Sequence, residues 1–457
     1  MKLKQIVEDY PITMTVSVNG VLSVFASAFT RPSYSVFLLL VMGAILAGRR
    51  HTVTRMIMAA GVRGSHHARF HRFFAKARWD PDELWRLFGQ LVDQFFEIVG
   101  IAIDDTAQKK TGAKIYGAAV VHDNRPTVHK GWDFCWGLTW VVATYHVRVK
   151  LWGWHVFAIP ALVRLYQNEK LCEKEGRPFK TKTLIALEMV QRLDQWFPGR
   201  RFRLHVDGGY AYAPLMKKLP LGMEAVGRVR RYAALFELPP SGKSKSRGRP
   251  RQRGQPLPTP QELVPQDDRP WARVRVRRGK KYEVKSWRVL WWSVFGPRPI
   301  LLVASRRPGR DTTLQFFYST DLTMTAGEVV QAYDDRWPIE VFFHEIKERM
   351  GMEEPQCWTP KAVLRTTPFL VLVAGLVQVW FLSQKDAAAI GFRPRWRNKR
   401  RSPKTPPCFS EMLAATRTEI LTVTFSATSA PSADLKKNIA ALIWQLSQAA
   451  RKCETIV

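Results

Sequence analysis

The densest group of side chains that could do chemistry lies between Gln331 and Gly351, in the stretch QAYDDRWPIEVFFHEIKERMG. Pro338 fits the first turn of a helix, because its φ is fixed near the helical value and it has no N–H to leave unpaired. Glu340 then lies near the positive N-terminal end of that helix. At about 100° per residue, Glu340 and Lys347 share nearly one face, with His344 beside it. The stretch therefore predicts a helix that presents a carboxylate and an ammonium to the same ligand.

The other face of this predicted helix is apolar. It carries hydrophobic residues at steps of three and four positions, which is the pattern of a face packed on a core: Ile339, Phe342, Phe343, Ile346 and Met350. An amphipathic helix with a solvated charged face has the same pattern. Residues elsewhere in the chain must therefore decide whether Glu340 takes part in chemistry.

Carboxylates also follow two predicted strands. Ile98 to Ile103 is an apolar run typical of a buried strand, and Asp104 and Asp105 stand at its exit. Phe202 to Val206 predicts another strand, which ends at Asp207 before a Gly-Gly pair that allows a sharp turn. A single aspartate at a strand end is commonly a turn residue. Because neighbours on a strand point to opposite faces, only one of the two adjacent aspartates is expected in a shared site.

Tyr333, Arg336, Glu340 and Lys347 follow one another at spacings of three, four and seven residues. This pattern resembles the Tyr-Arg-Glu-Lys signature of bacterial insertion-sequence transposases of the DDE superfamily. The resemblance is strongest at residues 331–351 and extends over about residues 50–385. It implies a ribonuclease-H-like core in which Glu340 is the third catalytic carboxylate.

The resemblance also implies two catalytic aspartates upstream, and Asp105 and Asp207 are the expected ones. Asp104 competes for the first position, but Asp105 is preferred because the resembling families usually place this ligand directly before Thr. Three close carboxylates repel one another, and divalent cations that favour oxygen ligands relieve the repulsion. The expected cofactor is Mg²⁺, with Mn²⁺ as a substitute, at two ions per active site held by Asp105, Asp207 and Glu340.

The implied reaction is cut-and-paste transposition: the protein binds the ends of its own element, cleaves them and joins the freed 3′-OH ends to target DNA. A hairpin intermediate and a flipped base stacked on a tryptophan of an inserted β domain are associated with this class. Here the strand expected to enter the site, Pro299 to Val303, has no aromatic residue at its start. Trp287, Trp291 and Trp292 lie one strand earlier. Core packing is the alternative for all three.

The signature implies that its tyrosine, arginine and lysine hold the phosphate near the cleaved end, the arginine through two donors. Other DNA contacts are expected in the same stretch and on the predicted strand Glu224 to Arg230. The full set is Tyr333, Arg336, Trp337, His344, Lys347, Arg228 and Arg230. The structural alternative is an ion pair of Arg336 or Lys347 with a nearby acid, for which the candidates are Asp334, Asp335 and Glu345.

The predicted fold is α/β: a ribonuclease-H-like mixed sheet with flanking helices, interrupted by an all-β insertion and preceded by a helical N-terminal DNA-binding region. The expected segments are residues 1–97 for the helical region, 98–224 for the first part of the core, 225–320 for the insertion with a basic disordered loop at 239–270, 321–385 for the second part with the catalytic helix, and 386–457 for a basic linker and helical tail. Within the first segment, residues 52–75 have the layout of helix, tight turn, helix. This layout predicts either a helix-turn-helix or a plain helical hairpin.

The composition favours a nucleic-acid partner. The chain has 71 Lys and Arg against 38 Asp and Glu, a net charge of +33, and 46% of its residues are hydrophobic. A folded protein with this charge is expected to bind a polyanion, here double-stranded DNA. Because two ends must be cut together, a homodimer on DNA is expected.

The five cysteines are far apart and odd in number, which indicates reduced thiols rather than a disulfide framework or a zinc site. The apolar runs Val36 to Ala47 and Phe369 to Leu382 are shorter than a membrane span, so buried helices and no membrane association are expected. The N-terminus lacks a cleavable apolar region. These features predict a cytoplasmic protein, and the resemblance implies a nucleoid-associated protein of a bacterium.

Two other functions stay open. One is a DNA-binding protein derived from a transposase that no longer cleaves, against which the complete set of carboxylates argues. The other is a ribonuclease-H-like nuclease that cuts without joining. A strand-transfer assay separates the second function from transposition.

Overall fold

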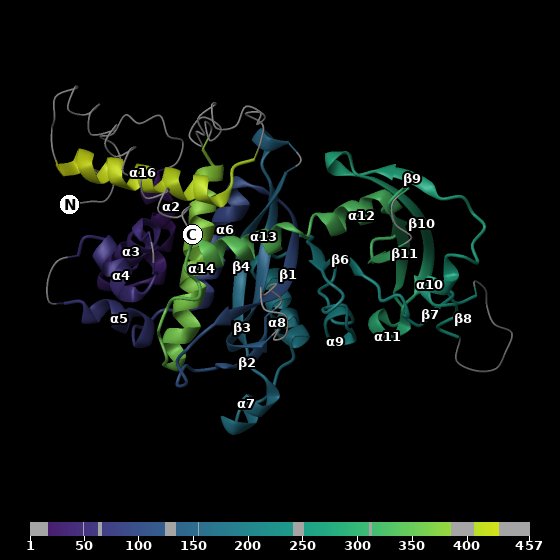
Figure 1. The fold of residues 1–457 in the computed structure, drawn as a ribbon, viewed down its shortest axis with the longest axis horizontal. Helices are drawn as coiled ribbons and strands as arrows, with labels where there is room; N and C mark the ends of the chain where they lie inside the picture. The colour runs from purple at the N-terminus through teal and green to yellow at the C-terminus, as the bar shows by residue number, and fades with distance from the viewer. Residues whose placement is uncertain are drawn as a thin grey trace.

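The computed structural model describes residues 17–428 except 49, 63–65, 124–133, 154, 241–250, 310–312 and 385–405. Helices gather at one end of the molecule, a mixed sheet lies in the middle, and a β-rich part forms the other end (Figure 1). The elements are described below in this order.

The expected N-terminal helices are present: α2 (Val18–Ser23), η1 (Val24–Ala28), α3 (Arg31–Leu46), α4 (Val53–Ala59), α5 (Ala68–Ala75) and α6 (Pro81–Phe95). Their starts follow local capping rules. Thr52 accepts a hydrogen bond from the Arg55 N–H at the start of α4, and Asp80 caps α6 just before Pro81. Gly61, in the turn between α4 and α5, has φ +68°, a conformation that suits glycine.

The middle of the molecule is a mixed sheet. Its strands are β1 (Glu97–Lys109), β2 (Ala119–His122), β3 (Phe134–Arg148), β4 (Val156–Tyr166), β5 (Arg203–Val206) and β6 (Glu224–Arg228). β3 lies antiparallel between β4 and β1, while β1, β5 and β6 pair in parallel. The flanking helices and turns before β6 are η2 (Lys150–Trp152), α7 (Glu169–Lys174), α8 (Lys182–Trp196) and α9 (Ala213–Met216). The predicted mixed sheet with flanking helices is confirmed.

The β-rich end extends this sheet. Its elements are β7 (Leu235–Phe236), β8 (Pro256–Leu257), α10 (Pro260–Leu263), β9 (Ala272–Arg275), η3 (Arg277–Gly279), β10 (Lys281–Leu290), α11 (Trp292–Phe295), β11 (Pro299–Arg306) and β12 (Gln315–Ser319). β12 pairs antiparallel with β6, at Phe317 opposite Arg228, so the inserted strands continue the core sheet.

Part of the segment predicted as a disordered loop, residues 239–270, has regular structure. β8 and α10 lie within it. The helix forms because Thr259 and Glu262 make a capping box around Pro260, a local signal that the low hydrophobicity of the segment obscured. Residues 241–250, the most basic part, lie outside the described residues.

The second part of the core consists of α12 (Ala326–Asp334), α13 (Pro338–Glu348) and α14 (Pro360–Leu382), and α16 (Phe409–Thr428) follows. Among the described helices, α14 alone is long and apolar enough to cross a membrane, but 94% of its apolar window is buried inside the fold. Phe88 and Pro160 lie against Gly375 of this helix. The two apolar runs are therefore helices of the core, as predicted.

Two buried arginines connect the N-terminal helices to the rest of the chain through hydrogen bonds. Arg365 on α14 donates to the Trp79 carbonyl at 2.7 Å, and its guanidinium lies 4.3 Å from the centre of the Trp79 ring. Arg417 on α16 donates to the Ile45 carbonyl at 2.6 Å, in the last turn of α3. Because both bonds are buried, the N-terminal helices form one packed unit with α14 and α16.

Candidate active site

One guanidinium links two carboxylates from distant parts of the chain. Arg336 donates from Nη1 to Asp104 Oδ2 at 2.6 Å and from Nη2 to Glu340 Oε1 at 3.0 Å. Asp104 lies on β1, Arg336 lies in the turn between α12 and α13, and Glu340 lies in the first turn of α13. Only 10% of the Arg336 side chain and 15% of the Asp104 side chain are exposed. These three residues form the centre of a charged cluster, in which Asp104 and Arg336 are largely buried and the Glu340 side chain is 38% exposed.

Asp207 stands next to this cluster. It follows β5, whose last residue, Val206, pairs in parallel with Ile103 on β1. Its Oδ1 accepts hydrogen bonds from the backbone N–H groups of Gly209 at 2.8 Å and Tyr210 at 3.2 Å. The tight turn after the strand, predicted from the glycine pair, thus orients the carboxylate.

The electrostatics of Asp104 reflect its neighbours. Burial raises the pKa of Asp104 to about 7, the charge of Arg336 lowers it, and the charge of Asp207 raises it again. Asp104 and Asp207 therefore repel each other, and Arg336 is the cation that contacts both Asp104 and Glu340.

Asp105 has different partners. It accepts hydrogen bonds from Lys182 Nζ at 2.6 Å and from the Tyr210 hydroxyl at 3.0 Å. Because consecutive strand residues point to opposite faces, Asp105 faces α8 while Asp104 faces the guanidinium of Arg336. The structure thus places Asp104, and not the preferred Asp105, in contact with Arg336. The position before Thr could not decide this, since the face of a strand residue depends on pairing with neighbouring strands.

Tyr333 lies half-buried beside the cluster. Its ring centre is 4.7 Å from that of Phe317 on β12, and the Arg336 guanidinium lies 5.7 Å from it. Burial raises the pKa of Tyr333, whereas the charges of Arg336 and Arg228 lower it. Tyr333 therefore helps to orient the arginine that links the carboxylates.

The two arginines predicted on the strand before the insertion are exposed and near the Asp207 turn. Arg228 is the last residue of β6. Its Cβ lies close to Gly208, since a Cβ added to Gly208 would be 3.9 Å from it. Arg230 donates to the Tyr212 hydroxyl, and its guanidinium lies 5.0 Å from that ring. Both cations are thus available at the surface next to Asp207.

The remaining predicted contacts lie on or beside α13. Trp337 is 62% exposed, His344 is exposed and Lys347 is half-buried. They are positioned to meet a ligand that approaches along α13.

Arg336 does not form the predicted alternative ion pair with Asp334, Asp335 or Glu345 among the ion pairs of the described residues. Arg336 is ion-paired, but with Asp104 and Glu340. The neighbouring Asp334 and Asp335 pair with residues of the insertion, at 2.9 Å to Lys280 and 2.8 Å to Arg277. These two ion pairs hold the end of α12 against the inserted strands.

Sequence reasoning missed several polar residues at the site. Lys182 and Tyr210 lie 77 and 105 residues from Asp105, so no local spacing revealed them. His146 and His205 are buried near enough to Arg336 to feel its charge, with ring centres 5.4 Å apart. Burial, with the charge of Arg336 as a further cause, lowers the pKa of His146 to about 3, so this imidazole is neutral.

The donor chemistry of the site fits a divalent metal ion, because three carboxylates supply hard oxygen ligands. As the side chains stand, however, no group of three or more His, Cys, Asp or Glu within the described part of the chain converges closely enough to hold an ion. Arg336 accounts for this, since its guanidinium occupies the space between Asp104 and Glu340. A metal ion would have to displace it.

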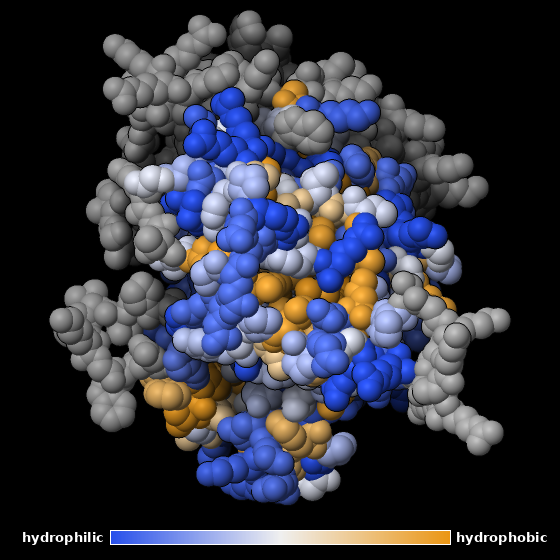
Figure 2. Space-filling model, turned by 90° about the vertical axis from the view of Figure 1, so that its right-hand side faces the viewer, coloured by the Kyte–Doolittle hydropathy of each residue, from blue (hydrophilic) through white to orange (hydrophobic). Residues whose placement is uncertain are grey.

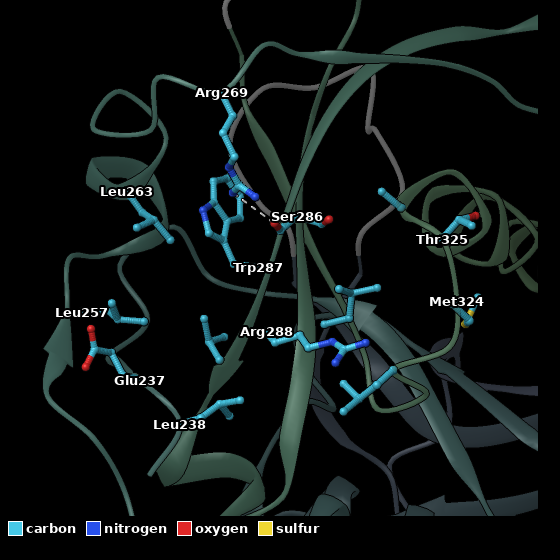
Figure 3. Close-up of a pocket in the computed structure, with 14 residues that line it drawn as sticks. Glu237, Leu238, Leu257, Leu263, Arg269, Ser286, Trp287, Arg288, Met324 and Thr325 are labelled. Carbon is cyan, nitrogen blue, oxygen red and sulfur yellow. Dashed lines mark hydrogen bonds between the residues drawn. The ribbon is translucent and has the colours of Figure 1, made fainter. Parts of the chain in front are cut away.

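A pocket lies elsewhere, in the β-rich end. It has a volume of about 810 Å³, and Trp287, Leu257 and Leu263 are among its lining residues (Figure 3). Arg269 lies 5.5 Å from the centre of the Trp287 ring and donates to the Ser286 carbonyl. Figure 2 shows an apolar area amid hydrophilic residues on this end of the molecule. The pocket contains none of the three carboxylates, so we do not assign the chemistry to it.

The other two tryptophans of the insertion differ in burial. Trp291 is buried against Phe295 and Tyr318, with ring centres 6.0 Å from each. Trp292 is half-buried below the guanidinium of Arg253. Trp291 thus packs in the core, which was the alternative to stacking on a base.

The structure has a mixed α/β fold in which Arg336 contacts Asp104 and Glu340, and Asp207 lies near Asp104. A family model described as DDE superfamily endonuclease matches residues 24–283, more than half of the chain, and one described as archaeal putative transposase ISC1217 matches residues 300–384. The chain belongs to the DDE superfamily of endonucleases. Members of this superfamily generally use divalent metal ions.

Similarity to solved structures is remote. A piggyBac transposase, solved as a synaptic complex with hairpin DNA, has 12% sequence identity and a TM-score of 0.41, over 93% of this chain and 80% of that chain. No curated protein sequence matches the chain.

Proposed function

We propose that this protein is a DNA transposase that binds the ends of its own insertion sequence, cleaves them and joins the 3′-OH ends to target DNA. The observation that most supports this proposal is that the Arg336 guanidinium donates to both Asp104 and Glu340, with Asp207 nearby. We assign the catalytic carboxylates as Asp104, Asp207 and Glu340. Asp104 replaces the expected Asp105 in this assignment because of its position.

Two Mg²⁺ ions held by these carboxylates would supply activation of the attacking oxygen and stabilisation of the leaving 3′ oxygen. The chain's own residues then bind and orient the DNA. Arg336, once the carboxylates have another cation, has two N–H groups to donate to a phosphate. The Tyr333 ring restrains that guanidinium by lying next to it, and Arg228 adds positive charge beside Asp207.

End recognition is assigned to the N-terminal helices. α5 buries Phe70, Phe73 and Phe74 and exposes Arg69 and Arg72. With α4 and the turn at residue 61, it forms a helix-turn-helix whose second helix presents cations to the DNA. Two such chains, one for each end, would act as a homodimer in the cytoplasm of a bacterial host.

The test is incubation of the purified protein with DNA that carries the sequences flanking its gene, in Mg²⁺ and in Mn²⁺, beside a Glu340→Gln variant. We expect cut ends with the wild type and bound but uncut DNA with the variant. Addition of target DNA should yield joined products. Cleavage without joining would identify a nuclease, and binding without cleavage in either metal would identify a DNA-binding protein. Cleavage by Glu340→Gln would refute the assignment of this carboxylate.

A further inference from the structure

Behind the catalytic face of β1 lies a second polar cluster, built from Asp105, Tyr210 and Lys182. Tyr210 donates from its hydroxyl to Asp105 Oδ1 at 3.0 Å, and Lys182 donates from Nζ to Asp105 Oδ2 at 2.6 Å. Both oxygens of the carboxylate are therefore occupied, each by a side chain from a different segment. The cluster joins β1 to the start of α8 and to the turn after β5.

The turn after β5 is the one that carries Asp207. The backbone N–H of Tyr210 donates to Asp207 Oδ1 at 3.2 Å, while the side chain of the same residue donates to Asp105. Tyr210 thus contacts one carboxylate through its backbone and another through its hydroxyl. Since Asp105 directly follows Asp104, Tyr210 connects the positions of two proposed catalytic aspartates, Asp104 on β1 and Asp207 in the turn after β5.

The chemistry of the cluster keeps this connection intact. Tyr210 is 3% exposed. Lys182 supplies the positive charge that balances Asp105, and its side chain remains 39% exposed.

We propose that Tyr210 and Lys182 are positioning residues, which act through Asp105 to hold Asp207 at the separation from Asp104 that metal binding requires. The proposal rests on the function proposed above. It assigns Asp105 a supporting role instead of metal ligation. Removal of a partner that orients a metal ligand typically lowers metal affinity about 10–100-fold.

The test is a titration of the full-length protein with Mn²⁺ in the absence of DNA, followed by calorimetry and by the electron paramagnetic resonance signal of free Mn²⁺. We expect Tyr210→Phe to weaken Mn²⁺ binding about 10–100-fold while its melting temperature without metal changes little. The matched control is Tyr145→Phe, because Tyr145 is also fully buried and its hydroxyl has no partner within the described residues. The control should bind Mn²⁺ as the wild type does.

Lys182 gives a second measurement that does not alter the core. We expect Lys182→Met to weaken Mn²⁺ binding and Lys182→Arg to restore most of it, because the charge is retained. Mn²⁺ affinities of Tyr210→Phe and Lys182→Met equal to that of the wild type would overturn the proposal. The proposal would also be overturned if Asp105→Asn abolished Mn²⁺ binding while Tyr210→Phe left it unchanged, since Asp105 would then be a direct ligand.

Failure of the proposed function has a different signature. In that case the wild type itself binds no Mn²⁺, or Glu340→Gln binds as well as the wild type, and the positioning role falls with it. If the wild type binds and Glu340→Gln does not, the affinities of the Tyr210 and Lys182 variants decide the positioning role alone.

Discussion

Asp104 and Arg336 form a buried ion pair at 2.6 Å although 232 residues separate them in the chain. The same guanidinium reaches Glu340, so it neutralises two carboxylates that would otherwise repel each other and Asp207. In the absence of metal, Arg336 is thus the cation of the site.

Substitution Arg336→Met should destabilise the metal-free protein. Breaking a buried ion pair by removal of one partner typically costs about 3–5 kcal/mol, because the remaining charge is left uncompensated. We expect a fall of this order in the free energy of unfolding, measured by urea denaturation, and partial recovery in Mn²⁺. The control is Arg86→Met, which breaks an exposed pair with Glu83 and should cost about 0–1 kcal/mol. Equal losses in the two variants would contradict the role of Arg336.

The two adjacent aspartates should differ in their effect on cleavage. Asp104→Asn removes a proposed metal ligand, and a loss of several kcal/mol of transition-state stabilisation corresponds to about 10³-fold or more in rate. Asp105→Asn removes a supporting partner and should lower the rate about 10–100-fold. Single-turnover cleavage of end-bearing DNA measures both. The reverse order of severity would restore Asp105 as the ligand.

The buried histidine below the site predicts how stability depends on pH. Unfolded, His146 takes up a proton near pH 6.5, whereas the folded protein holds its pKa at about 3. Between these values the unfolded state binds more protons, so stability present above pH 6.5 is lost as the pH falls toward 3, at up to about 1.4 kcal/mol per pH unit. Urea denaturation from pH 7.5 to 4 should show a weaker dependence in His146→Leu than in the wild type. His122→Leu, which changes an exposed histidine, should retain the wild-type dependence.

The proposed recognition helix predicts a change in salt dependence. Each neutralised phosphate contributes about 0.9 to the slope of log affinity against log salt. The double variant Arg69→Gln, Arg72→Gln should lower the slope for end-bearing DNA by about 2, measured by fluorescence anisotropy. Lys170→Gln with Lys174→Gln, an equal charge change on the exposed face of α7, is the control. An unchanged slope in the α5 variant would place DNA binding elsewhere.

The sequence by itself determined the local parts of the site. Pro338 begins α13 and puts Glu340 in its first turn, and Asp207 directly follows β5, both as predicted. The buried apolar runs and the mixed α/β fold were also predictable. These features depend on residues close together in the chain, whose periodicity and capping are visible without the fold.

Only the tertiary structure decided which aspartate joins the glutamate. The face of β1 that carries Asp104 is fixed by its register with β3, which includes an irregularity between Ile98 and Gly100. Lys182 and Tyr210 reach Asp105 from segments that only the paired sheet brings together. A one-residue change of register would exchange the two faces, and no local signal in the sequence records it. The pairing of the strands therefore determines why two adjacent, identical residues have different partners.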